Sequence, residues 1–434
     1  MKYTLPRTLL AISVFAVVLA VSEKCAHALP AFALREKVSC TLCHTNGSAP
    51  HLTKVGYIYR RAGFRFPTNI GNAEADSKSM TFQEHMAAGL NVDYEYVRNA
   101  PPGQGVSAST TSNQFNIPEV ELWPVVGGFL GNYAFWSEID ATPGAAGQTA
   151  SVNLSMADLR YIGGTPDFFY GFRGGLMALE GYGASDQWID DGNIPLMDRL
   201  TPNYNQDTVS APLGAMNNPE YGLEVNLSYM RTQSFLTLGM YNGYDGTGGT
   251  ASLQSALMRE KAGGLNKDFR AQIDQMIADY GSITATYYIG AIQITNPASG
   301  PNWTDHYNHE RLYLTYFALP NTLDVFLGGA LASNEYMTAA TGSSNGSFSS
   351  TGGFFGLNYY AMPHMTVSGR VDTYRFSTRS ESHQHANGYS VQVGLPFENN
   401  QYVVRFNRTS TDLASGDFSV GNTSDFRAEW RFLF

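Results

Sequence analysis

Apolar and polar residues alternate with a period of two over most of the chain between residues 117 and 434. The last segment is the clearest, because Phe426 and Trp430 fall on one face while Arg427 and Arg431 fall on the other. The same alternation recurs in the segments 221–229, 283–291, 312–318 and 389–395. Successive side chains of a strand point to opposite faces, so the pattern predicts a series of β-strands.

Both a soluble β-sandwich and a membrane β-barrel produce such alternation. Three features favour the barrel: strands of about ten residues, connections that alternate between short and long, and aromatic residues near strand ends. The chain also ends on Phe434 at the end of a predicted strand, as bacterial outer-membrane barrels do. We therefore expect an all-β outer-membrane barrel of about 14–16 antiparallel strands over residues 117–434, in contact with outer-membrane lipid.

Two stretches, Gly181–Pro219 and Gly243–Asp279, do not alternate, and the second contains helical-looking pieces at 252–260 and 267–279. Either stretch could form a solvated external loop or fold inward and narrow the lumen. We favour solvated loops.

The first 28 residues have the pattern of a cleaved signal peptide. Lys2 and Arg7 form a basic start, an apolar run follows from residue 8 to 21, and Ala26-His27-Ala28 offers a small-residue cleavage site. The apolar run is too short to span a bilayer comfortably. We expect export across an inner membrane.

Residues 29–98 lack the two-residue period and are predicted to form a small, mostly helical domain, with helical stretches at 49–61 and 81–98. Residues 99–116, rich in Ser, Thr, Gly and Pro, are interpreted as a linker. About 70 residues bury little apolar surface unaided, so this domain needs an additional core.

Cys40-Thr41-Leu42-Cys43-His44 suggests what that core is. The only other cysteine, Cys25, lies in the predicted signal peptide, so no long-range disulfide framework is expected. A redox-active dithiol would need a thioredoxin-like βαβ context, and a zinc site would need two further ligands. The motif C-x-x-C-H in an exported chain favours one covalently bound haem c, with thioether bonds from Cys40 and Cys43 and His44 as the proximal iron ligand.

The sixth iron ligand is less constrained. The candidates are His51, Met80, His85 and Met86. The last three lie 36 to 42 residues after His44, enough chain to reach the distal face, and of these we favour Met80. Five basic residues are candidates to neutralise the haem propionates, or are ordinary solvated charges: Arg35, Lys37, Arg60, Arg61 and Arg65.

Around this motif the sequence resembles a known family. The run P-A-F-A-L-R-E-K-V-S-C-T-L-C-H and the segments Pro50–Tyr57 and Gly63–Pro67 look like the fused monohaem cytochrome–porins, outer-membrane cytochromes of iron-oxidising bacteria. The resemblance implies a small N-terminal cytochrome ahead of a barrel of about sixteen strands, and Cys40, Cys43 and His44 carry over by position.

The expected function is an electron conduit in the outer membrane of a Gram-negative bacterium, with the haem in the barrel lumen or on the periplasmic side. One electron at a time would pass from an extracellular donor, taken to be Fe(II), to a periplasmic cytochrome or other carrier. Two alternatives stay open: electron export to an extracellular acceptor, and a diffusion porin with a haem-containing plug or sensor.

The net charge and a few further residues bear on the possible partners and activities. The formal charge of −10 argues against nucleic acid as a partner. No acid–base pair accompanies the haem motif, so we expect no hydrolytic or group-transfer activity. The acidic residues Asp186, Asp190 and Asp191 either attract cations or simply solubilise a loop. The pairs His306/His309 and His383/His385 are candidate metal ligands on external loops, or chance pairs.

Overall fold

The computed structural model describes residues 31–45, 52–72, 85–100, 110–142, 151–179, 183–185, 195–199, 203–204, 207–208, 219–242, 267–294, 303–319, 321–338, 344–362, 365–378, 383–397, 400–411 and 422–433. The predicted signal peptide, the candidate ligands His51 and Met80, and the loop residues Asp186, Asp190 and Asp191 lie outside these ranges. None of the described helices is long and apolar enough to cross a bilayer.

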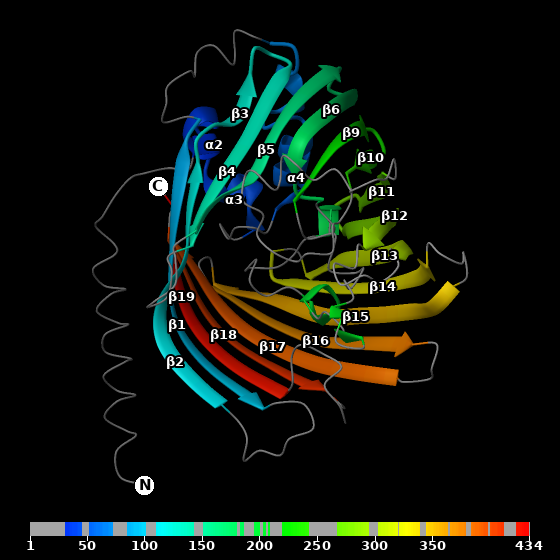
Figure 1. The fold of residues 1–434 in the computed structure, drawn as a ribbon. Coiled ribbons are helices and arrows are strands. Elements are labelled where there is room, and N and C mark those ends of the chain that lie inside the picture. Colours follow the sequence, from blue (N-terminus) through cyan, green and yellow to red (C-terminus); the bar gives the residue numbers. More distant parts are fainter. Residues whose placement is uncertain are drawn as a thin grey trace, which may run out of the picture.

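One antiparallel sheet closes on itself to form a barrel (Figure 1). Its strands are β1 (Ala87–Ala100), β2 (Thr110–Trp123), β3 (Val126–Phe129), β4 (Tyr133–Thr142), β5 (Ser151–Gly164), β6 (Phe168–Met177), β9 (Glu220–Tyr229), β10 (Ser234–Tyr241), β11 (Asp268–Ile277), β12 (Gly281–Ile294), β13 (Trp303–Leu319), β14 (Leu323–Thr338), β15 (Ser344–Met362), β16 (Met365–Thr378), β17 (His383–Phe397), β18 (Asn400–Thr411) and β19 (Asn422–Leu433). A separate two-stranded ribbon joins β7 (Asn203–Tyr204) to β8 (Asp207–Thr208).

In the described residues the barrel wall has 16 strand positions, which we call staves. Of the 17 strands in the sheet, β2 and β3 both pair with β4, on either side of a break at residues 124–125, and so form one interrupted stave. β1 pairs with both β2 and β19, which closes the sheet. Closure removes the unpaired strand edges that lipid cannot satisfy. The expected range of strand numbers is confirmed at its upper limit.

The apolar side chains of the strands face outward and the polar ones face inward, the reverse of a soluble protein. Leu312, Val371 and Trp430 on the outer face are 49%, 56% and 39% exposed, while the inward-facing Arg370 and Gln392 are buried. Lipid outside and a polar lumen inside require this arrangement, which excludes the sandwich alternative.

Connections alternate between short and long. The turns β5–β6, β9–β10, β11–β12, β13–β14, β15–β16 and β17–β18 are all short and lie at one end. Short turns face the periplasm in outer-membrane barrels, and long loops face outward. Exposed aromatic side chains form a girdle at the short-turn end: Tyr133, Phe168, Tyr229, Tyr280, Tyr316, Tyr359 and Trp430. Such a girdle marks a membrane interface.

The barrel begins earlier than the sequence analysis placed it. β1 occupies Ala87–Ala100, where a helix was predicted over residues 81–98, and β2 starts at Thr110 inside the predicted linker 99–116. The helix prediction was wrong. Leu90, Val92 and Tyr94 alternate with polar residues, and this two-residue period is typical of a strand. A register shift where β2 passes Asn91 and Asp93 obscured the same period in β2. The predicted helical piece at 267–279 is likewise strand β11.

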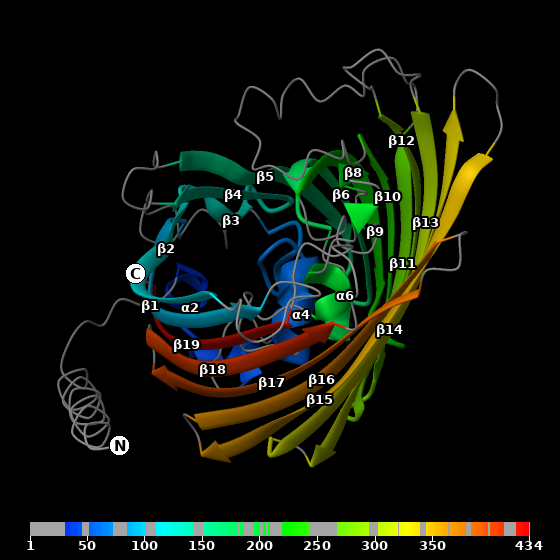
Figure 2. The same ribbon diagram turned by 60° about the horizontal axis from the view of Figure 1, so that its bottom comes forward.

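The residues before β1 form a plug inside the barrel, which we define as residues 31–45 and 52–72. It contains the helices α2 (Ala31–Glu36), α3 (Cys40–Cys43) and α4 (Lys54–Arg61) and the 3-10 turn η2 (Pro67–Asn69). Figure 2 shows α2 and α4 enclosed by the ring of strands. The helical stretch predicted at 49–61 is confirmed over α4.

Parts of the connection between β6 and β9 also lie in the lumen. The turn η5 (Gly183–Ser185) contacts β11, β12 and β13, and α6 (Leu196–Arg199) contacts β15, β16 and β17. Leu196 and Met197 of α6 are buried, and Gly352 and Gly388 on the wall leave room for them. Our preference for a solvated loop was therefore wrong for these two pieces, which fold inward and narrow the lumen (Figure 2).

Candidate functional site

The predicted haem-attachment residues form one short turn in the plug. Cys40 and Cys43 begin and end α3, and His44 follows as its C-cap, with its backbone N–H donating to Cys40 O at 2.8 Å. Both thiols are half-buried, and neither takes part in a disulfide. Burial, the neighbouring Cys40 and the Glu36 carboxylate raise the pKa of the Cys43 thiol. Two thiols on one turn followed directly by an imidazole are the donor set that a covalent haem c requires, so the residues present fit that group.

The start of α4 holds this turn in place. Thr53, the N-cap of α4, accepts from Gly56 N, while its own backbone N–H donates to Cys43 O at 2.8 Å and its hydroxyl donates to Leu42 O at 2.6 Å. Gly56 packs directly on the turn: a Cβ at this position would lie 2.1 Å from Cys43 O. The hydrogen bonds of Thr53 and the absence of a side chain at Gly56 therefore allow α3 and α4 to pack in direct contact.

Two side chains of α4 fix the plug to the barrel wall. Arg61 donates to Asn226 Oδ1 at 2.8 Å and Thr237 Oγ1 at 2.6 Å, on β9 and β10, and also to two backbone carbonyls of these strands. Tyr57 donates to Asp274 of β11 at 2.8 Å. Burial and the Asp274 carboxylate raise the pKa of Tyr57 well above its usual value, so its hydroxyl stays a donor.

The rest of the plug packs on β3, β4 and β5. Arg65 is buried and donates to the carbonyl of Gly131 at 2.7 Å, in the turn before β4, and to that of Tyr133 at 2.5 Å, at the start of β4. Phe64 stacks on Trp136 with ring centroids 5.1 Å apart, and Arg160 of β5 lies 4.6 Å from the centroid of Phe64. The plug is thus held by both polar and aromatic contacts.

The opposite side of the plug also reaches the wall. Thr45, directly after His44, lies beside the hydroxyl of Tyr360 of β15. The plug, which includes the C-x-x-C-H turn, therefore bridges the lumen near the short-turn end, from β3–β5 past β9–β11 to β15.

The five basic residues considered for the propionates have different surroundings. Arg61 and Arg65 dock the plug on the wall, and Arg35 binds Glu36, the Tyr59 hydroxyl and Phe64 O within the plug. Arg60 lies over the Tyr57 ring, 5.5 Å from its centroid, and Lys37 is exposed. Docking by arginine was missed at the sequence level because carbonyl partners on distant strands leave no local pattern.

Two candidates for the sixth ligand are described. His85 is tied to β3: its Nδ1 lies 3.1 Å from Val126 O, and Val126 N–H donates to His85 O at 2.8 Å. Met86 is half-buried beside it, at the start of β1. Met80 and His51 lie outside the described residues, so Met80 stays a prediction.

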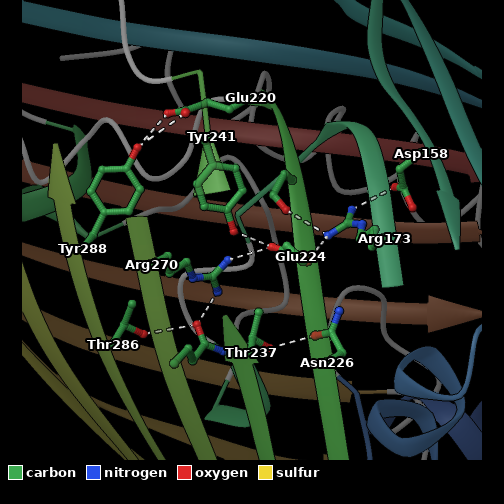
Figure 3. A network of polar contacts seen from close by, with 12 residues as sticks. Asp158, Arg173, Glu220, Glu224, Asn226, Thr237, Tyr241, Arg270, Thr286 and Tyr288 are labelled. Carbon is green, nitrogen blue, oxygen red and sulfur yellow. Dashed lines mark hydrogen bonds and ion pairs between the residues drawn. The ribbon is translucent and has the colours of Figure 1, made fainter. Parts of the chain in front are cut away.

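A chain of ion pairs and hydrogen bonds runs along the lumen wall (Figure 3). Asp158 binds Arg173 at 2.8 Å, Arg173 and Arg270 both bind Glu224 at 3.4 Å, and Arg270 contacts Gln272. Gln272 donates to Asp274 at 3.0 Å, which accepts from Tyr57 in turn. The wall and the plug thus share one continuous polar network.

The histidine pairs do not lie on external loops as predicted. His306 and His309 belong to β13, and His383 and His385 to β17. His309 points inward, fully buried against Tyr288 and Tyr307, with ring centroids 5.6 and 5.5 Å away, whereas His306 is exposed. Residues three positions apart in a strand point to opposite faces of the sheet. His306 and His309 therefore cannot bind the same metal ion.

Comparison with solved structures supports the barrel. The outer membrane channel DcaP of Acinetobacter baumannii matches with a TM-score of 0.51 and 11% identity, over 80% of this chain and 96% of that one. An anion-selective porin from Comamonas acidovorans matches with a TM-score of 0.51 and 9% identity, over 80% of this chain and 98% of that one.

No protein-family model matches the sequence, and no curated protein matches it significantly. At these identities the likeness concerns the fold alone. Together with the apolar outer face and the aromatic girdle, it establishes a porin-like, 16-stave β-barrel of the Gram-negative outer membrane.

Proposed function

We propose that the protein is a porin-like channel whose plug carries one covalently bound haem c, and that this haem passes single electrons across the outer membrane. The observation that carries the proposal is the position of Cys40, Cys43 and His44 on one turn inside the lumen. Cys40 and Cys43 would hold the haem through thioether bonds, and His44 would bind its iron. When bound, the haem supplies one-electron oxidation and reduction.

The residues around the motif have tasks that support this proposal. Thr53 and Gly56 hold the C-x-x-C-H turn against α4, and Tyr57 and Arg61 hold α4 against the barrel wall. An electron carrier must keep a constant distance to its partners, and a docked plug provides this. The plug lies at the short-turn end, where a periplasmic cytochrome can approach, while a donor such as Fe(II) would enter from the loop end.

A diffusion porin with a haem-containing plug is the second candidate. The porin-like fold favours a channel more directly than it favours electron transfer. In that case the haem-bearing plug would restrict or sense what passes. The inward pieces η5 and α6 narrow the lumen in either case.

The test uses purified full-length protein in liposomes that enclose a ferric or dye acceptor. External Fe(II) should reduce the enclosed acceptor in proteoliposomes with the wild-type protein, and the Cys40→Ala/Cys43→Ala variant should be inactive. The variant Arg231→Gln, at an exposed turn, serves as the matched control. Rapid swelling in permeant sugars without any acceptor reduction would favour the porin; a chain purified without haem would end the electron-transfer proposal.

Met80 as the sixth ligand is part of the same proposal. A visible and near-infrared spectrum of the oxidised protein distinguishes methionine from histidine ligation. Met80→Ala should abolish the methionine signature and lower the reduction potential, whereas Met86→Ala should change neither. The reverse pattern would assign Met86 instead.

A further inference from the structure

The carboxylate of Asp274 holds both the plug and η5 at the same point of the barrel wall. Asp274 lies on β11 and is fully buried. Its Oδ2 accepts a hydrogen bond from the hydroxyl of Tyr57, on α4 of the plug, at 2.8 Å. Its Oδ1 accepts from the backbone N–H of Ala184, in η5, at 3.1 Å. Two segments that lie far apart in the chain therefore share one acceptor group.

The wall fixes the orientation of this carboxylate. Gln272 Nε2 of the same strand donates to Oδ2 at 3.0 Å, and the Thr284 hydroxyl of β12 donates to Oδ1 at 2.7 Å. Each oxygen is thus bound by the wall and also by one of the two segments. Because the two oxygens of a carboxylate move together, a rotation that follows one segment weakens the hydrogen bond to the other.

η5 also packs against the plug itself. Ala184 contacts the apolar cluster of Tyr57, Phe235 and Met276, in which the rings of Tyr57 and Phe235 meet edge to face with centroids 5.2 Å apart. The carbonyl of Ala184 accepts from the Ser282 hydroxyl of β12 at 3.0 Å. Ala184 is therefore in contact with both the plug and the wall.

Gly183 brings η5 this close to the carboxylate. A Cβ at this position would lie 2.0 Å from Asp274 Oδ1, and the φ of 52° is one that glycine adopts without strain. Even a methyl group must therefore displace η5 or turn the carboxylate. Either movement reaches Tyr57, through the apolar cluster or through Oδ2.

We infer that η5 and the plug form one gate, which is held to the wall through Asp274. Displacement of η5 loosens the plug, and release of Tyr57 loosens η5. Coupling between two sites is reciprocal, so each segment affects the other by the same free energy. A solute that displaces η5 from the lumen would therefore loosen the plug. This coupling needs only the protein's own residues, so it operates with or without haem.

Hydrogen–deuterium exchange of the full-length protein in lipid nanodiscs tests the coupling from both sides. Gly183→Ala disturbs η5, and exchange over residues 54–61 of the plug should become about fivefold faster or more, as expected for one lost hydrogen bond. Tyr57→Phe removes only the hydroxyl from the plug, and exchange of the Ala184 amide should rise by a similar factor. In the double variant the two factors should not multiply, because both changes release the same carboxylate.

Gly352→Ala is the matched control for Gly183→Ala. A Cβ at Gly352 would lie 2.2 Å from the Cβ of Met197, so this variant displaces the other inward piece, α6. α6 packs on β15, β16 and β17, and plug exchange should therefore stay unchanged. Should Gly183→Ala fail to assemble, which heat-modifiable electrophoretic mobility reveals, Ser282→Ala disturbs η5 from the wall side and should also accelerate plug exchange.

The gate would be overturned if each variant accelerated exchange only in its own segment, or if the two factors multiplied in the double variant. Equal acceleration of plug exchange in Gly352→Ala would overturn it as well, because a general loosening of the lumen would then explain the result. A protein that never carries haem would refute the proposed electron transfer, yet these exchange rates would still decide the gate.

Discussion

Replacing Gly56 by Ala tests how the C-x-x-C-H turn is held. Alanine in place of glycine within a helix ordinarily stabilises by about 0.5–1 kcal/mol. Here the new methyl group would lie 2.1 Å from Cys43 O, whereas a carbon and an oxygen usually approach to about 3.3 Å. The turn and α4 must therefore separate by about 1 Å, a shift that follows from the usual contact distance.

The size of the effect follows from what this separation disturbs. Overpacking of this kind costs about 1–3 kcal/mol. The two hydrogen bonds from Thr53 to Cys43 O and Leu42 O weaken as well, at about 1 kcal/mol each if lost. These losses outweigh the helix preference, so we expect a net local destabilisation of about 1–3 kcal/mol.

The assay is hydrogen–deuterium exchange of the plug in full-length protein, read over residues 52–61. Exchange should become about tenfold faster, since about 1.4 kcal/mol changes an opening equilibrium by that factor. Gly369→Ala is the matched control, because a Cβ there meets open space and should leave the plug unchanged. Slower exchange in Gly56→Ala would show that helix preference prevails, and the close contact with Cys43 would then be refuted.

Three further predictions concern docking, thiol reactivity and the lumen. Arg61→Met should loosen the plug by about 2–4 kcal/mol through its lost hydrogen bonds, and limited proteolysis of residues 54–61 should become faster; unchanged protection would contradict the docking role. In haem-free protein, the raised pKa of Cys43 keeps the thiolate scarce, so alkylation should need a higher pH than for a free thiol, and Glu36→Gln should lower that pH. Met197→Asp should expel α6 from the wall and raise single-channel conductance, with equal conductance refuting the inward placement.

Much of the barrel could be predicted from the sequence because membrane strands carry their own signature. In β19, Phe426 and Trp430 face outward and Glu429 faces inward, as the alternation indicated. The signature was overlooked in β1, and in β2 a register shift and a Ser- and Thr-rich stretch obscured the period. It failed also at α6, because a short apolar piece such as Leu196-Met197 does not reveal which surface covers it.

The plug was predictable only in part. The C-x-x-C-H motif is local, and its turn has the expected form, but whether it carries haem stays a proposal. What positions this turn comes from distant residues: Asp274, Asn226 and Thr237 meet α4 only after the barrel has closed. No spacing in the sequence relates Tyr57 to a carboxylate 217 residues further on.

Closure of β1 on β19 has a consequence for the order of biogenesis. The plug immediately precedes β1, and its contacts extend from β3 to β15, so the wall that surrounds it is complete only when the last strand has paired. A plug that lies in the lumen cannot be threaded in after the barrel has closed without breaking those contacts. Any covalent modification of Cys40 and Cys43 would therefore have to precede or accompany insertion, while the chain is still open to the periplasm.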